Sequence, residues 1–202
     1  MLSKIPVAVF VSGGGTNLQA ILEAERRGEI PDGEIRLVLS NREGVYAFER
    51  AKRFGVETVC VSRTQFPDAG RREEEMLRVL QERGIGMIVL AGYLSVLSAS
   101  FTSRYAGRMI NVHPSLIPSF CGKGYYGLKV HEAALARGVK VTGATVHYVN
   151  EIPDGGEIIA QKAVCVRADD TPETLQRRVM EEAEWILLPR AVEEVCKKLR
   201  GE

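Results

Sequence analysis

A pair of polar residues interrupts an apolar stretch at residues 107–113, which read GRMINVH. Asn111 and His113 alternate there with Ile110 and Val112. Because successive side chains of a β-strand point to opposite faces, the amide and the imidazole should share one face. An uncharged amide donor beside a titratable imidazole suits the oxyanion that forms during acyl transfer. The pattern also fits a hydrogen-bonded loop anchor without chemistry, and the sequence leaves both interpretations open.

A carboxylate stands in the segment NEIPDGGEII, where Asp154 precedes two glycines. Asp-Gly is common in turns, so a simple turn explains this residue. If the chain brought Asp154 close to His113, the carboxylate would favour the charged imidazolium near neutral pH. The sequence alone does not show whether the two groups meet.

A glycine-rich loop, SGGGTN at residues 12–17, follows the first apolar run. Glycines let a ligand approach the backbone closely, and the amides at the start of a following helix favour an anion such as phosphate. Leu18 stands where the dinucleotide fingerprint needs a third glycine, and a Gly-Lys-Ser/Thr sequence of the Walker A type is missing. The loop therefore predicts a phosphate-bearing ligand other than NAD or ATP, unless it is only a tight turn.

The elements that would position these residues alternate between strand and helix patterns along the chain. This alternation predicts an α/β fold with three αβα layers and a mostly parallel, Rossmann-like sheet. The last two strands, with only a turn between them, should form an antiparallel pair at its C-terminal end. We expect strands at 5–11, 34–40, 56–62, 85–92 (central in the sheet), 107–113, 139–149 and 156–166, and helices at 16–28, 46–55, 72–84, 128–138 and from 171 onward. Since ligands of open α/β sheets bind at the carboxyl ends of the strands, the polar pair lies where a crevice should be.

Two helix starts have readable signals. Thr16 and Gln19 fit a capping box, and Thr171 followed by Pro172 fits a cap with proline at the first helical position. Pro189 predicts a possible kink in the long C-terminal helix.

Composition limits the class of protein. The 202 residues are 45% apolar without a linker-like segment, which predicts one catalytic domain over residues 1–202. Lys and Arg (27) nearly balance Asp and Glu (26), so no nucleic-acid partner is expected. The absence of a long apolar run or a cleavable leader predicts no membrane partner and a cytoplasmic location. The four cysteines lack a C-x-x-C motif, and His131 and His147 lack metal-ligand spacing, so no metal is expected.

Five segments in one colinear order resemble the phosphoribosylglycinamide formyltransferase family. They are VAVFVSGGGTNLQAI, VLAGYLSVLS, GRMINVHPSLIPSF, GVKVTGATVHYVNEIPDGGEIIAQ and RRVMEEAEWILLP. The resemblance implies the formyltransferase fold. It also implies transfer of a formyl group from 10-formyltetrahydrofolate, as cosubstrate, to the amine of glycinamide ribonucleotide in de novo purine biosynthesis. The amine would attack the formyl carbon directly, without an acyl-enzyme.

The resemblance also assigns roles by position. Asn111 and His113 would stabilise the tetrahedral oxyanion, and Asp154 would keep the imidazole charged and order a water that carries a proton. The residues expected to bind the ribonucleotide are Gly15, Thr16, Asn17 and Glu184. Those expected around the pterin head of the folate are Leu94, Ser95, Val96, Leu97, Asn150, Glu151, Ile152 and Pro153.

The sequence departs from the family at several points. Many members have Arg in place of Ser95 and Pro in place of Cys121, and the loop CGKGYYGLKVH looks longer than in some relatives. An Arg or Lys that contacts folate in the family could correspond to Arg71 or Arg72.

Three alternatives are less favoured. Methionyl-tRNA formyltransferase and formyltetrahydrofolate hydrolase share the trio but carry a further domain, which a chain of this length should lack. A nucleotide-binding module would need NAD, against which Leu18 argues. We therefore expect small-molecule partners and a monomer or homodimer.

Overall fold

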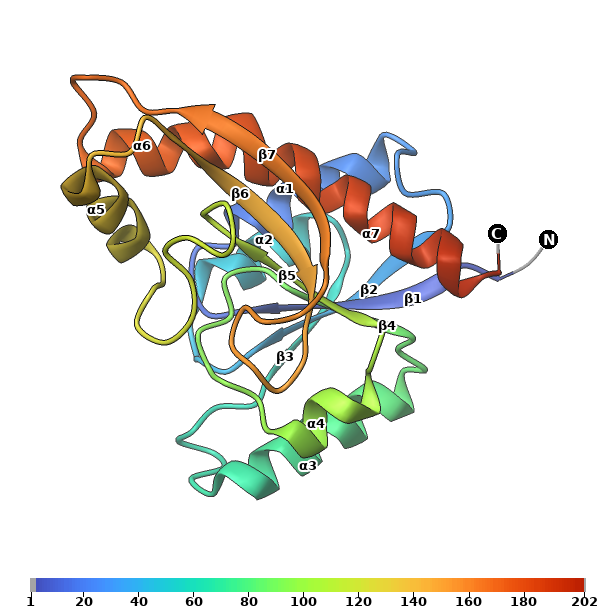
Figure 1. The fold of residues 1–202 in the computed structure, drawn as a ribbon. Helices are drawn as coiled ribbons and strands as arrows, with labels where there is room; N and C mark the ends of the chain where they lie inside the picture. Colours follow the sequence, from blue (N-terminus) through green and yellow to red (C-terminus); the bar gives the residue numbers. More distant parts are fainter. Residues whose placement is uncertain (1–2, 202) are drawn as a thin grey trace.

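Figure 1 shows a twisted sheet with helices packed on both of its faces. The computed structural model describes residues 3–201, so residues 1, 2 and 202 of the predicted domain lie outside the described part. The strands are β1 (Ile5–Val11), β2 (Gly33–Ser40), β3 (Glu57–Cys60), β4 (Met87–Leu90), β5 (Met109–His113), β6 (Val141–Tyr148) and β7 (Ile158–Cys165). The helices are α1 (Thr16–Arg26), α2 (Tyr46–Arg53), α3 (Ala69–Glu82), α4 (Ala99–Arg104), α5 (Leu128–Arg137), α6 (Pro172–Val179), the π-helical turn η1 (Met180–Glu184) and α7 (Trp185–Leu199).

The sheet has the order β3-β2-β1-β4-β5-β6-β7. Strands β1 to β5 pair in parallel, whereas β6 is antiparallel to both β5 and β7. The predicted fold class is confirmed, including the antiparallel C-terminal pair and the central position of the strand at 87–90. The order reverses between β1 and β4, so the loops after these strands diverge and leave room for a ligand.

Two apolar layers hold the helices to the sheet, because the parallel strands are buried on both faces. In β1, Val9 and Val11 face a core that includes side chains of α1, α2, α6 and α7. Ala8 and Phe10 face the opposite core, which α3 and α4 cover. This arrangement gives the three predicted layers, visible in Figure 1 with α3 and α4 together on one side.

The start of α1 differs from the prediction. The N-cap position belongs to Gly15, in the left-handed conformation at φ 72°, and no side-chain cap is present. Thr16 is the first helical residue, and its hydroxyl lies 3.7 Å from the sulfur of Met180. The predicted Thr16–Gln19 capping box is therefore wrong, because the backbone turn that opens the glycine loop occupies the cap position.

The C-terminal part of the chain also holds differences. The predicted cap at Thr171 is confirmed as a capping box with Thr174. The long helix changes its hydrogen-bonding pattern at the π-helical turn Met180–Glu184 and continues through Pro189 as α7. Helix α4 was not predicted, and residues 149–157 between β6 and β7 form a loop rather than a tight turn.

Candidate functional site

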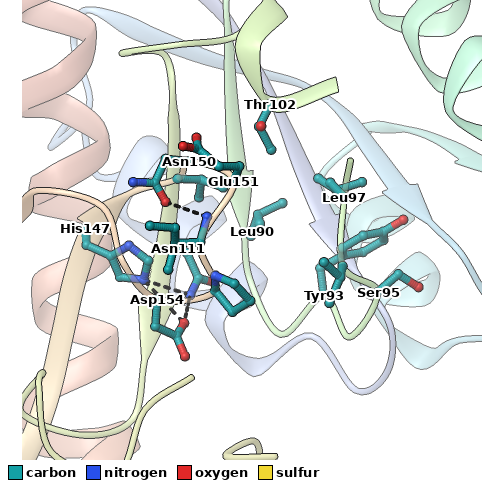
Figure 2. A pocket seen from close by; sticks show the side chains of 14 residues that line it. Leu90, Tyr93, Ser95, Leu97, Thr102, Asn111, His147, Asn150, Glu151 and Asp154 are labelled. Atoms are coloured by element: carbon teal, nitrogen blue, oxygen red, sulfur yellow. Dashed lines mark hydrogen bonds and ion pairs between the residues drawn. The ribbon is translucent and has the colours of Figure 1, made fainter. Parts of the chain in front are cut away.

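The polar pair on β5 meets Asp154 at the carboxyl end of the sheet. His113 Nδ1 lies 3.5 Å from Asp154 Oδ2, and Asn111 Nδ2 lies 3.4 Å from Asp154 Oδ1. Figure 2 shows Asn111 and Asp154 side by side at the edge of a pocket. The structure thus brings together the three predicted catalytic residues from two segments about forty positions apart in the sequence.

His113 has an oxygen near each ring nitrogen. Its Nε2 is 2.8 Å from the carbonyl oxygen of Phe120, while Nδ1 faces the Asp154 carboxylate. A carbonyl can only accept, so Nε2 carries a proton, and the Asp154 carboxylate can accept a hydrogen bond on the Nδ1 side of the ring. The residue is only 4% exposed, which restricts competition from solvent at both contacts.

The position of Asp154 depends on the loop that follows β6. The residue has a positive φ of 55°, and its Oδ2 accepts a hydrogen bond of 2.8 Å from the amide of Gly122. Burial alone would raise the pKa of the Asp154 carboxyl group. The nearby His147 ring, the charge at His113 and the Gly122 amide outweigh that effect and hold the pKa of Asp154 below its ordinary value.

His147 is a further member of this cluster that the sequence did not reveal. Its Nε2 lies 3.2 Å from Asn111 Nδ2 and 3.6 Å from Asp154 Oδ1, while Nδ1 lies 2.7 Å from the carbonyl oxygen of Tyr148. His147 lies beside Asn111 because the antiparallel register pairs Asn111 on β5 with His147 on β6. Cross-strand partners of this kind have side chains on the same face, so knowledge of the register would have identified His147.

Two cavities adjoin the cluster. A cleft of about 690 Å³ runs past His113, with Gly92 and Leu94 on one wall and residues 122–127 on the other. A smaller cavity of about 130 Å³ lies behind Asn111 and is shown in Figure 2. The predicted folate residues that line the smaller cavity are Ser95, Val96, Leu97, Asn150, Glu151, Ile152 and Pro153. Leu94 lines only the larger cleft, so the eight predicted residues are divided between two cavities that share part of their lining.

The main chain of the glycine loop, at the start of α1, is open to an anion. Cβ atoms placed on Gly13 or Gly14 would meet nothing within 4 Å, so both residues are open to a ligand. Gly15 is closely packed, because a Cβ there would lie 2.7 Å from the Cβ of Ala47. The first amides of α1 have no acceptor within the helix and carry its positive dipole end.

Glu184 and Asn17 join the C-terminal helices to this loop. Asn17 Nδ2 donates to Glu184 Oε2 at 2.6 Å, and the glutamate is only 6% exposed. Burial raises the pKa of Glu184 to about 7, although the hydrogen bond from Asn17 opposes this effect. Glu184 lies in the π-helical turn, a feature that often occurs at functional sites.

The structure distinguishes the two arginines before α3 that the sequence could not. Arg72 Nη1 donates to the carbonyl oxygen of Phe66, and its charge acts on the phenol of Tyr93 at the small cavity. Arg71 is exposed, and its backbone amide donates to Asp68. Of the two, Arg72 is the one whose charge acts on Tyr93, although neither arginine lines the small cavity or the larger cleft.

Within the described part of the chain, no group of three or more His, Cys, Asp or Glu side chains is arranged to hold a metal ion. None of the helices there is long and apolar enough to cross a membrane.

Comparisons with known proteins point in one direction. A family model described as formyl transferase matches residues 5–192. The chain is 37% identical over 186 residues to phosphoribosylglycinamide formyltransferase of Haemophilus influenzae, a match that covers 92% of this chain and 84% of that protein. It is 38% identical to a chloroplastic phosphoribosylglycinamide formyltransferase of Arabidopsis thaliana, with 95% of this chain covered.

Solved structures agree with these matches. The crystal structure of glycinamide ribonucleotide transformylase 1 from Symbiobacterium toebii has a TM-score of 0.90 and 37% identity, over 96% of this chain and 89% of that one. The lengths of the relatives differ, however. The chain spans 65% of the Arabidopsis protein and 19% of the trifunctional purine biosynthetic protein adenosine-3 of Gallus gallus.

Proposed function

The chain belongs to the formyl transferase family, and on that premise we propose that it transfers a formyl group from 10-formyltetrahydrofolate to the amine of glycinamide ribonucleotide. The products would be formylglycinamide ribonucleotide and tetrahydrofolate, in purine biosynthesis. The observation that carries the proposal is the contact of Asp154 with both His113 and Asn111 at the mouth of a cleft. Relatives named for this reaction support the choice of substrates.

The chemistry follows from the partners of the trio. The substrate amine attacks the formyl carbon, a C–N bond forms, and the carbonyl oxygen becomes an oxyanion. Asn111 Nδ2 and the charged ring of His113 stabilise that oxygen. An oxyanion is a stronger acceptor than the Phe120 carbonyl, so we expect the Nε2 proton of His113 to shift its hydrogen bond to it.

Proton movement completes the transfer. The attacking amine must lose a proton, and N10 of the folate must gain one as its bond to the formyl carbon breaks. Asp154, whose pKa is lowered, stays a carboxylate at neutral pH and can order a water between the two nitrogens. No covalent bond to the protein forms in this sequence.

Each substrate has a proposed binding surface. We assign the ribonucleotide phosphate to Gly15, Thr16 and Asn17, because the first amides of α1 suit an anion and the preceding Gly13 and Gly14 leave space for it. Glu184 would accept hydrogen bonds from ribose hydroxyls. The apolar walls and peptide groups of the small cavity suit a flat bicyclic head.

The remaining parts of the proposal concern the protein as a whole. We propose that the chain acts as a single catalytic domain on small molecules, as a monomer or homodimer in the cytoplasm.

A direct assay tests the function. Purified protein is mixed with 10-formyltetrahydrofolate, or with 10-formyl-5,8-dideazafolate, and glycinamide ribonucleotide, while the deformylated folate is followed by absorbance. We expect turnover that requires the ribonucleotide. Deformylation at the same rate without the ribonucleotide would indicate a hydrolase, and no absorbance change at micromolar protein would contradict the proposal.

A further inference from the structure

Three side chains outside the catalytic trio join the loops that follow neighbouring strands. Ser12 follows β1, Asn41 follows β2, and Ser95 lies in the loop after β4. Ser12 Oγ donates to Asn41 Oδ1 at 2.7 Å, and Asn41 Nδ2 donates to Ser95 Oγ at 2.6 Å. The amide of Leu94 donates to Ser12 Oγ at 2.9 Å, which closes a ring of hydrogen bonds through the backbone.

The position of Asn41 in this ring requires both halves of its amide. The carbonyl oxygen accepts from Ser12, while the nitrogen of the same planar group donates to Ser95. The sheet sets the geometry, since Val11 pairs with Ser40 and the next residue of each strand leaves the sheet beside its neighbour. The contacts are partly buried, where hydrogen bonds resist competition from water.

The two loops joined by Asn41 differ in how firmly they are otherwise held. The glycine loop is held by two further hydrogen bonds. Arg50 Nε donates to the carbonyl oxygen of Gly14 at 2.8 Å, and the amide of Ala47 donates to the carbonyl oxygen of Gly13 at 3.2 Å. Residues 92–97 lie outside any helix or strand. In this segment the side chains of Leu94 and Val96 are 49% and 79% exposed at the cleft.

We propose that Asn41 is a positioning residue for the folate-binding wall and acts through Ser95. By holding Ser95 and Leu94 against Ser12, it fixes the wall that the two cavities share, since Ser95 lines both of them. The inference rests on the proposed function. It predicts that the loss of Asn41 loosens folate binding while the ribonucleotide site, with its own anchors, keeps its affinity.

The test is a double-mutant cycle of Asn41→Ala and Ser95→Ala, with separate KM values for the formyl-folate and the ribonucleotide. We expect each single variant to raise the KM for formyl-folate about tenfold, which corresponds to one lost, partly buried hydrogen bond. In Asn41→Ala, the turnover number and the KM for the ribonucleotide should stay within about twofold of the wild type. Because Asn41 acts through Ser95, the double variant should be no worse than either single variant.

A matched control comes from the neighbouring loops. Ser62 Oγ donates to Glu43 Oε1 at 2.8 Å, so Ser62→Ala removes a similar contact between loops that does not reach the folate wall. Its KM for formyl-folate should be unchanged. Asn41→Asp offers a rescue, because a carboxylate can accept from the hydroxyls of both Ser12 and Ser95, and we expect a KM within about threefold of the wild type.

Several outcomes would overturn the inference. One is an unchanged formyl-folate KM in Asn41→Ala or additive effects in the cycle, and another is an equal rise in both KM values together with a lower melting temperature. If Asn41→Ala does not fold, Ser95→Ala and Asn41→Asp test the inference in its place. An unchanged KM for formyl-folate in Ser95→Ala would then refute the positioning role of Asn41. If the wild-type protein shows no formyl transfer, the proposed function is refuted as well. If the wild type is active and the variants fail to behave as expected, only the role of Asn41 is refuted.

Discussion

At the scale of single residues, His113 is defined by its two oxygen partners, Phe120 and Asp154. His113→Ala removes the charged ring that we assign to the oxyanion. We expect turnover to fall at least ~100-fold, the effect of losing one preorganised oxyanion donor or general acid. Ribonucleotide affinity, measured by calorimetry, should be retained because the phosphate loop lies on another element. Near-normal turnover would contradict the assignment.

His147 should have a smaller effect than His113, because it contacts Asn111 and Asp154 and we assign it no direct contact with the formyl group. His147→Ala removes one of the two contacts of the Asn111 amide and one partner of the Asp154 carboxylate. We expect turnover to fall about tenfold, close to the cost of one hydrogen bond. The two variants should be compared in the same assay, and a loss in His147→Ala as large as that in His113→Ala would show a direct catalytic role instead.

At the scale of elements, the sequence pattern predicted where strands end but not how their ends are connected. The two-residue period placed Asn111 and His113 on one face, and the structure agrees. The approach of Asp154 was implied by the family resemblance but could not be predicted from the residue pattern, since it depends on a left-handed residue and on an amide contributed by Gly122 in another loop. His147 was missed for a related reason, because the register of an antiparallel pair is set by packing in three dimensions.

Helix ends show the same limit. Thr171 and Thr174 form a capping box as their sequence predicts, whereas Thr16 and Gln19 do not. Close packing of Gly15 against Ala47 overrides the local capping preference. The π-helical turn around Glu184 was likewise invisible in the sequence, because helical periodicity does not reveal one additional residue in a turn.

The glycine loop gives a prediction with a built-in control. Gly15→Ala places a Cβ 2.7 Å from that of Ala47 on a residue at φ 72°, so both sterics and conformation oppose it. We expect a loss of about 1–3 kcal/mol in the free energy of unfolding and weakened ribonucleotide binding. Gly14→Ala meets nothing within 4 Å and should change stability by less than about 0.5 kcal/mol. Urea denaturation of both variants measures the difference, and equal stabilities would contradict this account of the loop.

At the scale of the whole molecule, the first and the last helical segments of the chain meet at the proposed ribonucleotide site. Asn17 and Glu184 are 167 positions apart in the sequence, yet they share a buried hydrogen bond of 2.6 Å. Alternation of strands and helices predicted the sheet and its layers, but not this contact. It places a carboxylate in an apolar environment between α1 and α7, where its ionisation affects the stability of the whole fold.

The sign of that effect follows from the pKa values. Glu184 has a pKa of about 7 in the folded protein, compared with 4.5 for an ordinary glutamate. Between these values the native state holds a proton that the unfolded chain has lost, so stability falls as the pH rises through this window. The loss is complete above pH 7 and amounts to about 3 kcal/mol, at about 1.4 kcal/mol for each pKa unit.

Glu184→Gln removes the ionisable group but keeps an oxygen that can accept from Asn17. The variant and the wild type should therefore be close in stability at pH 5, and the variant should become more stable by about 3 kcal/mol at pH 8. Urea unfolding at intervals between these pH values measures the difference. The same change should weaken ribonucleotide binding, because a neutral amide accepts ribose hydroxyls less strongly than a carboxylate. A stability difference that does not change with pH would contradict this account. It would show that Glu184 is already ionised in the folded protein at pH 5, so that burial does not raise its pKa.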